Sequence, residues 1–281
     1  MKKWYFKIVV ISIAILSLIS IKQNTLAEQA DQSAVIKCGD YAYIVLENGT
    51  AEIYAYSGTS KILILPTMLD GYSVSSIGSR AFYLSNVKEL TIPDSVVNIS
   101  SNAFSSCYSL SKLFIPDSVV SIEGNPFISC PLLKDITFAE SNDRFEFVDN
   151  VLFSKVDHSL LFYPSWLTEE EYTVPQGTSS IKAGAFANCQ NLKAIMLNND
   201  LKLIGDSAFS GCEALKEITL SSSLEKIGSY AFSNCYQLSN VALPNNTKEI
   251  GDYAFRNCRN LSEITLRSVY KELHADRETG C

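Results

Sequence analysis

Apolar residues recur along this chain in short alternating segments, and the segments repeat every 23 residues over most of its length. In one segment Leu90 and Ile92 flank Thr91, so two apolar residues alternate with a polar one. Such alternation predicts short β-strands with one buried face. Nine segments end at proline or at its replacement, at positions 66, 93, 116, 139, 175, 198, 221, 244 and 267. A period of about 20 to 50 residues predicts a solenoid whose units bury their apolar sides against each other.

A second set of apolar residues keeps the same phase. Six of its seven phenylalanines follow an alanine, and the seven are Phe82, Phe104, Phe127, Phe186, Phe209, Phe232 and Phe255. In residues 192–214 we expect Gly205 to allow a tight bend. Ala208, Phe209 and Cys212 would then fill the interior of the turn, each phenylalanine forming one layer of a continuous core.

Six of the eight cysteines follow the phased phenylalanines by three residues: Cys107, Cys130, Cys189, Cys212, Cys235 and Cys258. Equivalent side chains in a stack run parallel, whereas a disulfide needs a twisted Cβ–S–S–Cβ geometry. We therefore expect buried free thiols that act as small apolar fillers, with a ladder of disulfides as the alternative. In such surroundings serine should be tolerated less well than alanine, because its hydroxyl would need a partner.

The repeats occupy residues 71–269, and the segments on either side differ from them. Residues 28–70 have another spacing, and Asn48-Gly49 between two apolar runs predicts a β-hairpin that caps the first unit. Residues 270–281 hold no complete repeat, so they form either a tail or a truncated cap.

One repeat, at residues 140–175, is enlarged to 36 residues and lacks the Ala-Phe turn. Its sequence predicts two or three short strands around Asp149-Asn150 and Asp157-His158. Insertions in repeat proteins often form the binding face. The alternative is a self-packed hairpin whose aromatic residues replace the missing phenylalanine layer. A calcium site at Asp143, Asp149 and Asp157 has no support from a ligand loop of fixed spacing.

The first 27 residues have the features of a secretory signal peptide. Lys2, Lys3 and Lys7 come before or at the start of an apolar run, and small residues precede a cleavage point after Ala27. An uncleaved membrane anchor is the alternative, although the run is shorter than the roughly 20 residues that span a bilayer. We expect an exported protein, secreted or at the cell surface, with no membrane insertion after cleavage.

Charge and motif content exclude several function classes. Removing residues 1–27 with their four lysines would take the formal net charge from −7 to −11. Because nucleic-acid binding needs a basic surface, we expect no nucleic-acid partner. The two histidines, His158 and His274, lie in unrelated regions, and no nucleophile, phosphate-loop or zinc-protease motif occurs. We therefore predict no enzyme activity, no catalytic residues, no cofactor and no metal site.

The repeated phrases, for example IGDSAF at 204–209 and IGSYAF at 227–232, together with the insert VDNVLFSKVDHSLLFYP, resemble the BspA-like (treponemal-type) leucine-rich repeat family. The resemblance covers roughly residues 39–269. It implies a leucine-rich repeat solenoid of the α/β repeat class, with short parallel β-strands, irregular, 3-10 or helical turns and an N-terminal β-hairpin cap. It also implies secreted or surface proteins that act in adhesion or protein binding and have no known catalytic residues.

The strand face is the expected site of partner binding. Most residues that alternate outward on it are threonines, and Phe114 and Met196 are large apolar exceptions that could anchor an extracellular protein or glycan. The further candidates are Thr137, Thr219, Thr265, Glu217 and Glu263. The alternative function is a structural spacer, or a segment of a surface array, within a longer anchored protein.

Overall fold

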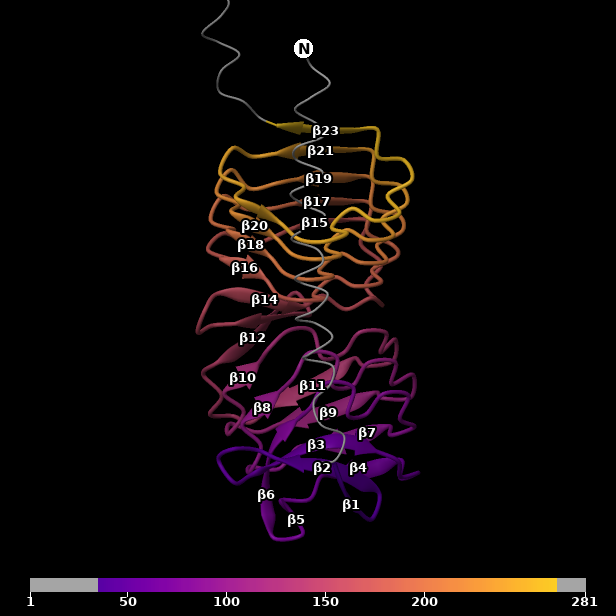
Figure 1. The fold of residues 1–281 in the computed structure, drawn as a ribbon, viewed down its shortest axis with the longest axis vertical. Coiled ribbons are helices and arrows are strands. Elements are labelled where there is room, and N and C mark those ends of the chain that lie inside the picture. Colours follow the sequence, from indigo (N-terminus) through magenta and orange to yellow (C-terminus); the bar gives the residue numbers. More distant parts are fainter. Residues whose placement is uncertain (1–34, 267–281) are drawn as a thin grey trace, which may run out of the picture. The chain divides into compact units, whose positions relative to one another are not determined.

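The computed structural model describes residues 35–266. The predicted signal peptide at 1–27 and the predicted tail at 270–281 lie outside these residues. The chain separates into two units, Met1–Ile36 and Lys37–Cys281, and the second holds the repeats. In Figure 1 its turns stack one upon another, from β1 at one end to β23 at the other. The described residues contain strands and hydrogen-bonded turns but no helix, so the solenoid is confirmed without the helical turns that the family resemblance allowed.

All nine predicted segments form the strands of one face of the solenoid, here called the strand face. The strands are β4 (Ile62–Ile64), β7 (Glu89–Thr91), β9 (Lys112–Ile115), β11 (Asp135–Phe138), β15 (Glu171–Thr173), β17 (Ala194–Met196), β19 (Glu217–Thr219), β21 (Asn240–Leu243) and β23 (Glu263–Leu266). They form three parallel sheets, β4–β7–β9–β11, β15–β17–β19 and β21–β23. Within each sheet a residue pairs with its equivalent in the next turn, as Leu90 does with Leu113. This register aligns the inward positions of successive strands into continuous apolar rows.

A second series of strands returns along another side of each turn. The series contains β3 (Ala51–Tyr56), β6 (Tyr72–Ile77), β8 (Asn98–Ile99), β10 (Ser121–Ile122), β14 (Ser159–Phe162), β16 (Ser180–Ile181), β18 (Leu203–Ile204), β20 (Lys226–Ile227) and β22 (Glu249–Ile250). The remaining strands are β1 (Ile36–Cys38), β2 (Tyr41–Val45), β5 (Met68–Leu69), β12 (Phe145–Val148) and β13 (Val151–Ser154).

The predicted hairpin at Asn48-Gly49 is present, because β2 and β3 pair antiparallel across that turn. Strand β3 then pairs in parallel with β6, which connects the hairpin to the first repeat. The Tyr56 ring stacks on Phe82 at 5.2 Å and so extends the aromatic core by one layer. The function of this hairpin as a cap stays a prediction.

The turns around six of the seven phased phenylalanines contain two residues in the left-handed conformation, two positions before the ring and two after it; around Phe127 only Ser129 adopts it. Around Phe209 these are Ser207, at φ 54°, and Gly211, at φ 76°. Gly205 does not have a positive φ, so the tight bend that we expected is not the reason why glycine stands at this position. A Cβ atom there would lie 2.6 Å from the backbone nitrogen of Ala183, so glycine allows neighbouring turns to approach closely.

The phased phenylalanines form a stacked aromatic column. Phe209 lies 4.9 Å from the ring of Phe186 and 5.1 Å from that of Phe232, and all three are fully buried. Offset stacking at this spacing stabilises the fold beyond the gain from burying the rings. Most of the core therefore joins neighbouring turns, as expected for a solenoid.

The cysteine column lies beside the aromatic column, and its thiols are free. Five of the six are buried, and Cys258 is half-buried. Each thiol donates a hydrogen bond to the backbone oxygen of the aromatic residue one turn earlier, as Cys212 does to Phe186 at 3.0 Å. Burial raises the pKa of the Cys212 and Cys235 thiols. The thiols therefore fill space in the core and also have a hydrogen-bond acceptor. A serine hydroxyl could use the same acceptor, so our reason for expecting serine to destabilise the fold more than alanine no longer holds.

Candidate functional site

The enlarged repeat interrupts both series of strands, because β10 and β12 belong to different sheets just as β11 and β15 do, and only the turns remain joined. On the turn side the two flanking repeats meet directly, because the buried Asn125 donates from its backbone nitrogen to Ala183 and from its side chain to Gly184, both at 2.8 Å. On the strand face β11 and β15 belong to different sheets, and no backbone hydrogen bond joins them among residues 35–266. The insertion therefore opens the strand face while the turns remain in contact.

Strands β12, β13 and β14 extend the sheet of the second series of strands at this level, because β14 pairs in parallel with β16. Alternate residues of the β13–β14 hairpin pack in opposite directions, with Leu152 and Phe162 in the core of the first repeats and Phe153 in the core of the later ones. Two consecutive rings continue the aromatic column in both directions. Phe162 lies 5.3 Å from Phe127, and Tyr163 lies 4.9 Å from Phe186.

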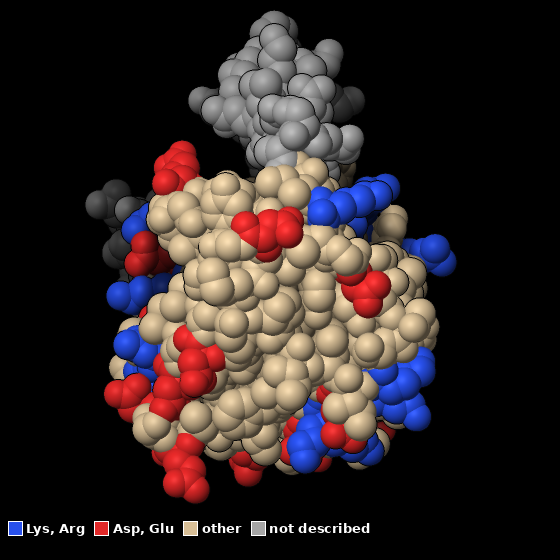
Figure 2. All heavy atoms as spheres, turned by 90° about the horizontal axis from the view of Figure 1, so that it is seen from below, with Lys and Arg blue, Asp and Glu red and all other residues tan. Residues whose placement is uncertain are grey.

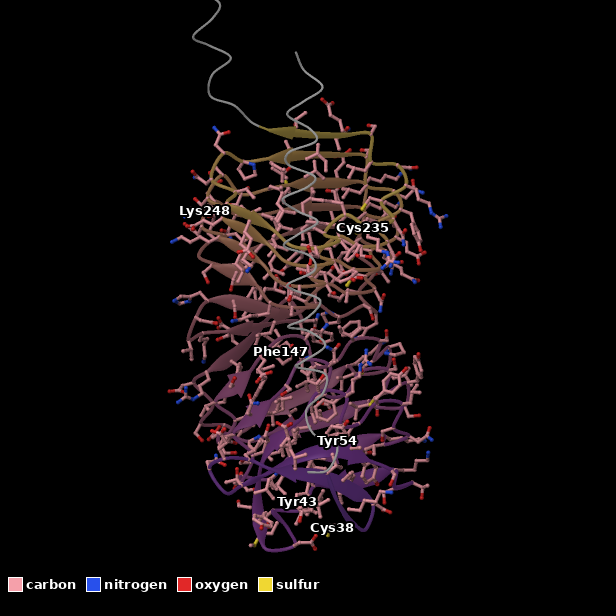
Figure 3. All side chains as sticks on the ribbon, in the orientation of Figure 1. Cys38, Tyr43, Tyr54, Phe147, Cys235 and Lys248 are labelled. Atoms are coloured by element: carbon pink, nitrogen blue, oxygen red, sulfur yellow. The ribbon has the colours of Figure 1, made fainter. Side chains whose placement is uncertain are left out.

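A first cavity, of about 210 Å³, opens between the beginning of β11 and the enlarged repeat. Its lining residues are Leu133, Lys134, Ile136, Phe147, Asn150, Phe162, Pro164 and Trp166. The indole nitrogen of Trp166 donates to the backbone oxygen of Leu133 at 2.8 Å, which fixes the ring. The Lys134 ammonium lies 5.2 Å from the centre of that ring. Phe147 keeps 38% of its surface exposed, and Figure 3 labels it at the level of this break.

A second cavity, of about 420 Å³, lies at the β15 side of the break. It is lined by Asp149, Asn150, Tyr163, Leu167, Glu169 and Tyr172. Asp149 and Asn150 form the turn between β12 and β13 and adopt left-handed backbone angles, φ 49° and 65°. Asn150 lines both cavities, so the tip of this hairpin separates them.

Carboxylates and tyrosines set the electrostatics of the second cavity. Burial raises the pKa of Tyr163, and the neighbouring Glu169 carboxylate adds to that effect. Burial also raises the pKa of Tyr172, with a contribution from Asp149. Neither Asp149 nor Glu169 forms an ion pair within residues 35–266, whereas the adjacent Glu170 pairs with Lys193. The cavity thus combines uncompensated negative charge with two aromatic rings.

The predicted site residues fall into separate groups on the strand face. Phe114 pairs with Thr137 before the break, and Met196 pairs with Thr219 after it. Thr265 and Glu263 lie further on, in β23, and Glu217 lies beside Thr219 in β19. Met196 is 49% exposed, but Phe114 is only half-buried, not the protruding anchor that we expected. Its ring lies in a continuous sheet with strands on both sides, where neighbouring side chains cover part of it.

Two exposed apolar residues were missed by the sequence reasoning. Ile62 and Ile64, in the edge strand β4, are each 70% exposed. Ile64 pairs with Thr91 and therefore belongs to the outward row, a position that the repeat register already indicates. The same end of the molecule, seen in Figure 2, has few charges at its centre, and Met68 of β5 adds to its exposed apolar surface.

Other chemistry proposed from the sequence is not assembled. Within residues 35–266 no group of three or more His, Cys, Asp or Glu side chains could hold a metal ion. His158 is exposed in the turn between β13 and β14, and its imidazole makes no hydrogen bond to the described residues. The same residues include no helix that could cross a bilayer.

A known family model matches the repeated part of the chain. The model described as "BspA type Leucine rich repeat region" matches residues 54–169 and 158–277, in six copies. The chain belongs to the BspA-type leucine-rich repeat family. Members of this family are typically surface or secreted bacterial proteins, and their solenoid is typically a non-enzymatic scaffold for interactions. No curated protein matches the chain.

Several solved structures are similar to this BspA-type chain. A leucine-rich cell surface protein of Faecalibacterium prausnitzii is 21% identical, with 86% of this chain and 97% of that chain covered and a TM-score of 0.45. The pneumococcal vaccine antigen PcpA is 22% identical, with 83% and 81% covered and a TM-score of 0.47. A leucine-rich repeat protein of T. pallidum is 22% identical, with 81% and 91% covered and a TM-score of 0.41.

Proposed function

We propose that this BspA-type protein is exported and binds an extracellular protein through its strand face, with the break between β11 and β15 as the centre of the contact. The observation that carries the proposal is the pair of cavities at this break, lined by aromatic side chains. Elsewhere on the strand face, threonines and charged residues are the usual outward side chains. Aromatic residues in concave, partly desolvated positions are the usual anchors of protein interfaces.

The two strand edges at the break support the same location. The outer edges of β11 and β15 have no backbone partner from each other, so an extended segment of a partner could hydrogen-bond there. Trp166 is held by its bond to Leu133, and a fixed ring loses little entropy on binding. A rigid solenoid that presents such a pocket can bind without a large change of shape.

Binding of the full chain to a panel of purified extracellular-matrix and serum proteins, measured by surface plasmon resonance, tests the proposal. We expect saturable binding to one panel protein, weakened at least tenfold by Phe147→Ser, since a buried aromatic anchor contributes about 1.4 kcal/mol or more. Tyr108→Ser is the matched control, because Tyr108 is an exposed aromatic residue in a turn away from the break.

Each other result has a definite meaning. Equal loss in the two variants would mean that any exposed aromatic residue is enough, and the break would not be the centre. Loss of binding in Met196→Ser but not in Phe147→Ser would place the contact at β17 and its neighbouring strands instead of at the break. Saturable binding to a glycan array without binding to any protein would contradict the protein partner.

The alternative function is a structural spacer that associates end to end. It is favoured by the exposed Ile62, Ile64 and Met68 at the β4–β5 end, where Figure 2 presents few charges at the centre of the surface. Sedimentation velocity of the wild type and of Ile64→Ser separates the two functions. Ordered self-association that Ile64→Ser abolishes, without protein binding, would support the spacer.

A further inference from the structure

The residues two positions before the phased phenylalanines form a row along the turn side of the solenoid. The row consists of Arg80, Asn102, Asn125, Gly184, Ser207, Tyr230 and Tyr253. Two neighbouring members leave the middle of the row without an outward side chain. Gly184 has no side chain, and that of Asn125 is buried, where it bonds to the Gly184 oxygen and the Phe127 nitrogen. The surface is therefore hollowed at the middle of the row.

This turn hollow has a volume of about 340 Å³. It extends from the turn of Phe82 to the turn of Phe209, so it is elongated along the axis of the solenoid. Small-molecule sites have volumes of about 300–1,000 Å³ and are mostly apolar. The turn hollow reaches that size but has a more polar lining. Its polar side chains are those of Arg80, Asn102, Asn188, Asp206, Ser207 and Ser210.

Four of these polar side chains make no hydrogen bond or ion pair within residues 35–266. The four are Arg80, Asn102, Ser207 and Ser210. The other two each use only part of their capacity. The Asn188 amide donates to the Ser129 hydroxyl at 2.9 Å, and the Asp206 carboxylate accepts from the Ser229 backbone nitrogen at 2.7 Å. The turn hollow therefore presents several donors and acceptors that a ligand can use.

The kinds of groups in the lining identify the class of ligand. The only charged side chains among the lining residues are one cation, Arg80, and one anion, Asp206, so neither an acidic nor a basic ligand is favoured. Amides and hydroxyls both donate and accept, as the hydroxyls of a sugar do. An extended peptide has no open strand edge to join here, because backbone groups along the row already bond to the next turn, as Ser207 does to Ser229.

Tyr230 continues the row one turn beyond Ser207. Its ring stacks on Tyr253 at 5.1 Å, so one face is covered and the other is directed back towards the turn of Ser207. Both tyrosines are exposed and have left-handed backbone angles, φ 56° and 57°. That conformation is costly for a bulky residue, and residues in costly conformations are concentrated at binding sites. An exposed aromatic face beside polar groups suits a sugar ring, which has an apolar C–H face and a rim of hydroxyls.

We propose that the turn hollow binds a neutral oligosaccharide that lies along the row. Its hydroxyls form hydrogen bonds with Arg80, Asn102 and Ser207, and one sugar ring lies on the open face of Tyr230. This ligand is separate from the protein proposed for the strand face, and its site uses none of the residues at the break.

NMR titration of the full chain with four neutral probes tests the inference: maltotetraose, cellotetraose, N-acetylchitotetraose and mannotetraose. We expect at least one to bind with a dissociation constant of about 1 mM or less. Raising the salt concentration should leave that affinity unchanged, because no charge on the ligand is neutralised. Tetragalacturonate is the acidic probe, and acetyl-Ala-Ser-Ala-Ser-amide is the peptide probe.

Variants of the row locate the bound sugar. Ser207→Tyr fills the turn hollow with the residue that the next two turns accept at the same φ, and it should weaken binding at least tenfold. Asn102→Gly removes the amide but keeps the left-handed conformation, so binding should weaken several-fold while the melting temperature stays the same. Asn257→Gly is the matched control, because Asn257 is also left-handed, at φ 59°, but does not line the turn hollow.

Tyr230→Asn separates a binding function of the ring from a structural one. Asparagine adopts the left-handed conformation more readily than tyrosine, so the melting temperature should not fall. Binding of the sugar should nevertheless weaken several-fold, because the open aromatic face is lost. If Ser207→Tyr fails to fold, Asn102→Gly and Tyr230→Asn decide the question.

Three results would overturn the inference. The first is that none of the four sugars binds at about 10 mM, tenfold above the expected constant. The second is binding of tetragalacturonate or of the peptide alone. The third is sugar binding that Asn102→Gly and Tyr230→Asn leave unchanged, or that Phe147→Ser abolishes, which would place the sugar at the break. Because Phe147→Ser should weaken only protein binding, the two proposals can fail independently.

Discussion

Replacement of Cys212 tests whether the buried thiols are hydrogen-bonded fillers. The side chain is fully buried, and its sulfur lies 3.0 Å from the backbone oxygen of Phe186. Cys212→Ala deletes one sulfur atom and leaves a small cavity, so it should destabilise the fold by about 1–2 kcal/mol. For a domain of this size that lowers the melting temperature by about 2–4 °C per kcal/mol. The Phe186 oxygen still accepts from the Cys189 backbone nitrogen, so it is not left unpaired.

Cys212→Ser is the informative variant. Its hydroxyl can donate to the Phe186 oxygen in place of the thiol, which offsets most of the desolvation of the hydroxyl. We therefore expect a stability within about 1 kcal/mol of Cys212→Ala. Without that acceptor, serine would be the worse replacement by about 2 kcal/mol or more. A penalty of that size would refute the hydrogen bond and restore the purely apolar interpretation.

Urea unfolding of the three proteins under reducing conditions, followed by circular dichroism and by tryptophan fluorescence, measures these differences. The transitions measured by the two methods must coincide before a single free energy of unfolding is derived, because a solenoid can unfold in sections. Cys258→Ser is the control, since Cys258 donates to Phe232 at 3.0 Å but is half-buried. Burial raises the pKa of Cys258 to about 11. Thiol titration of the native protein should label Cys258 before the fully buried Cys212.

Three further predictions concern stability. Phe209→Ala should cost about 3–5 kcal/mol in urea unfolding and Phe209→Leu clearly less, and equal losses would contradict the stacked column. Gly205→Ala should destabilise by about 1–3 kcal/mol, because its Cβ would lie 2.6 Å from the Ala183 nitrogen; wild-type stability would contradict that close approach. Partial burial opposes ionisation of Asp157, but hydrogen bonds, first from Lys182, lower its pKa to about 2. The ionised Asp157 contributes about 1 kcal/mol of stability, because its pair with Lys182 is largely exposed. This contribution should be complete above pH 4 and lost as pH falls through about 2. A loss of stability in Asp157→Asn that persists at pH 2 would refute the prediction.

The repeated part of this fold could be predicted because its signals are local and recur. Two-residue alternation predicts each strand of the strand face but not the short strands of the second series, and the phased phenylalanines are buried or, in the last repeat, half-buried. The reason for Gly205 could not be predicted, because it depends on the backbone of the preceding turn and not on its own φ. The acceptor of each thiol was likewise invisible, since it is a backbone oxygen from another repeat.

The candidate site was predicted only in part for a related reason. The insertion at 140–175 was evident, and Trp166 lies within it. Its effect on the strand face depends on Asn125 bonding directly to Ala183 and Gly184, a contact between residues 59 positions apart in the case of Gly184. Alternation alone places Phe114 outward, but how much of the ring is exposed depends on the side chains of the neighbouring strands.

The insertion can create a binding site without weakening the solenoid, because the hairpin completes both cores at once. Leu152 and Phe162 extend the core of the first repeats, and Val151 and Tyr163 extend the core of the later ones, so the thirteen additional residues leave no empty layer. The open strand edges at the break are then a feature that folding leaves without a backbone partner. Because the stability of the stack comes from layers that remain filled, residues at the break can change with little effect on the rest of the stack. That separation is what a repeat protein needs if one enlarged turn is to acquire specificity.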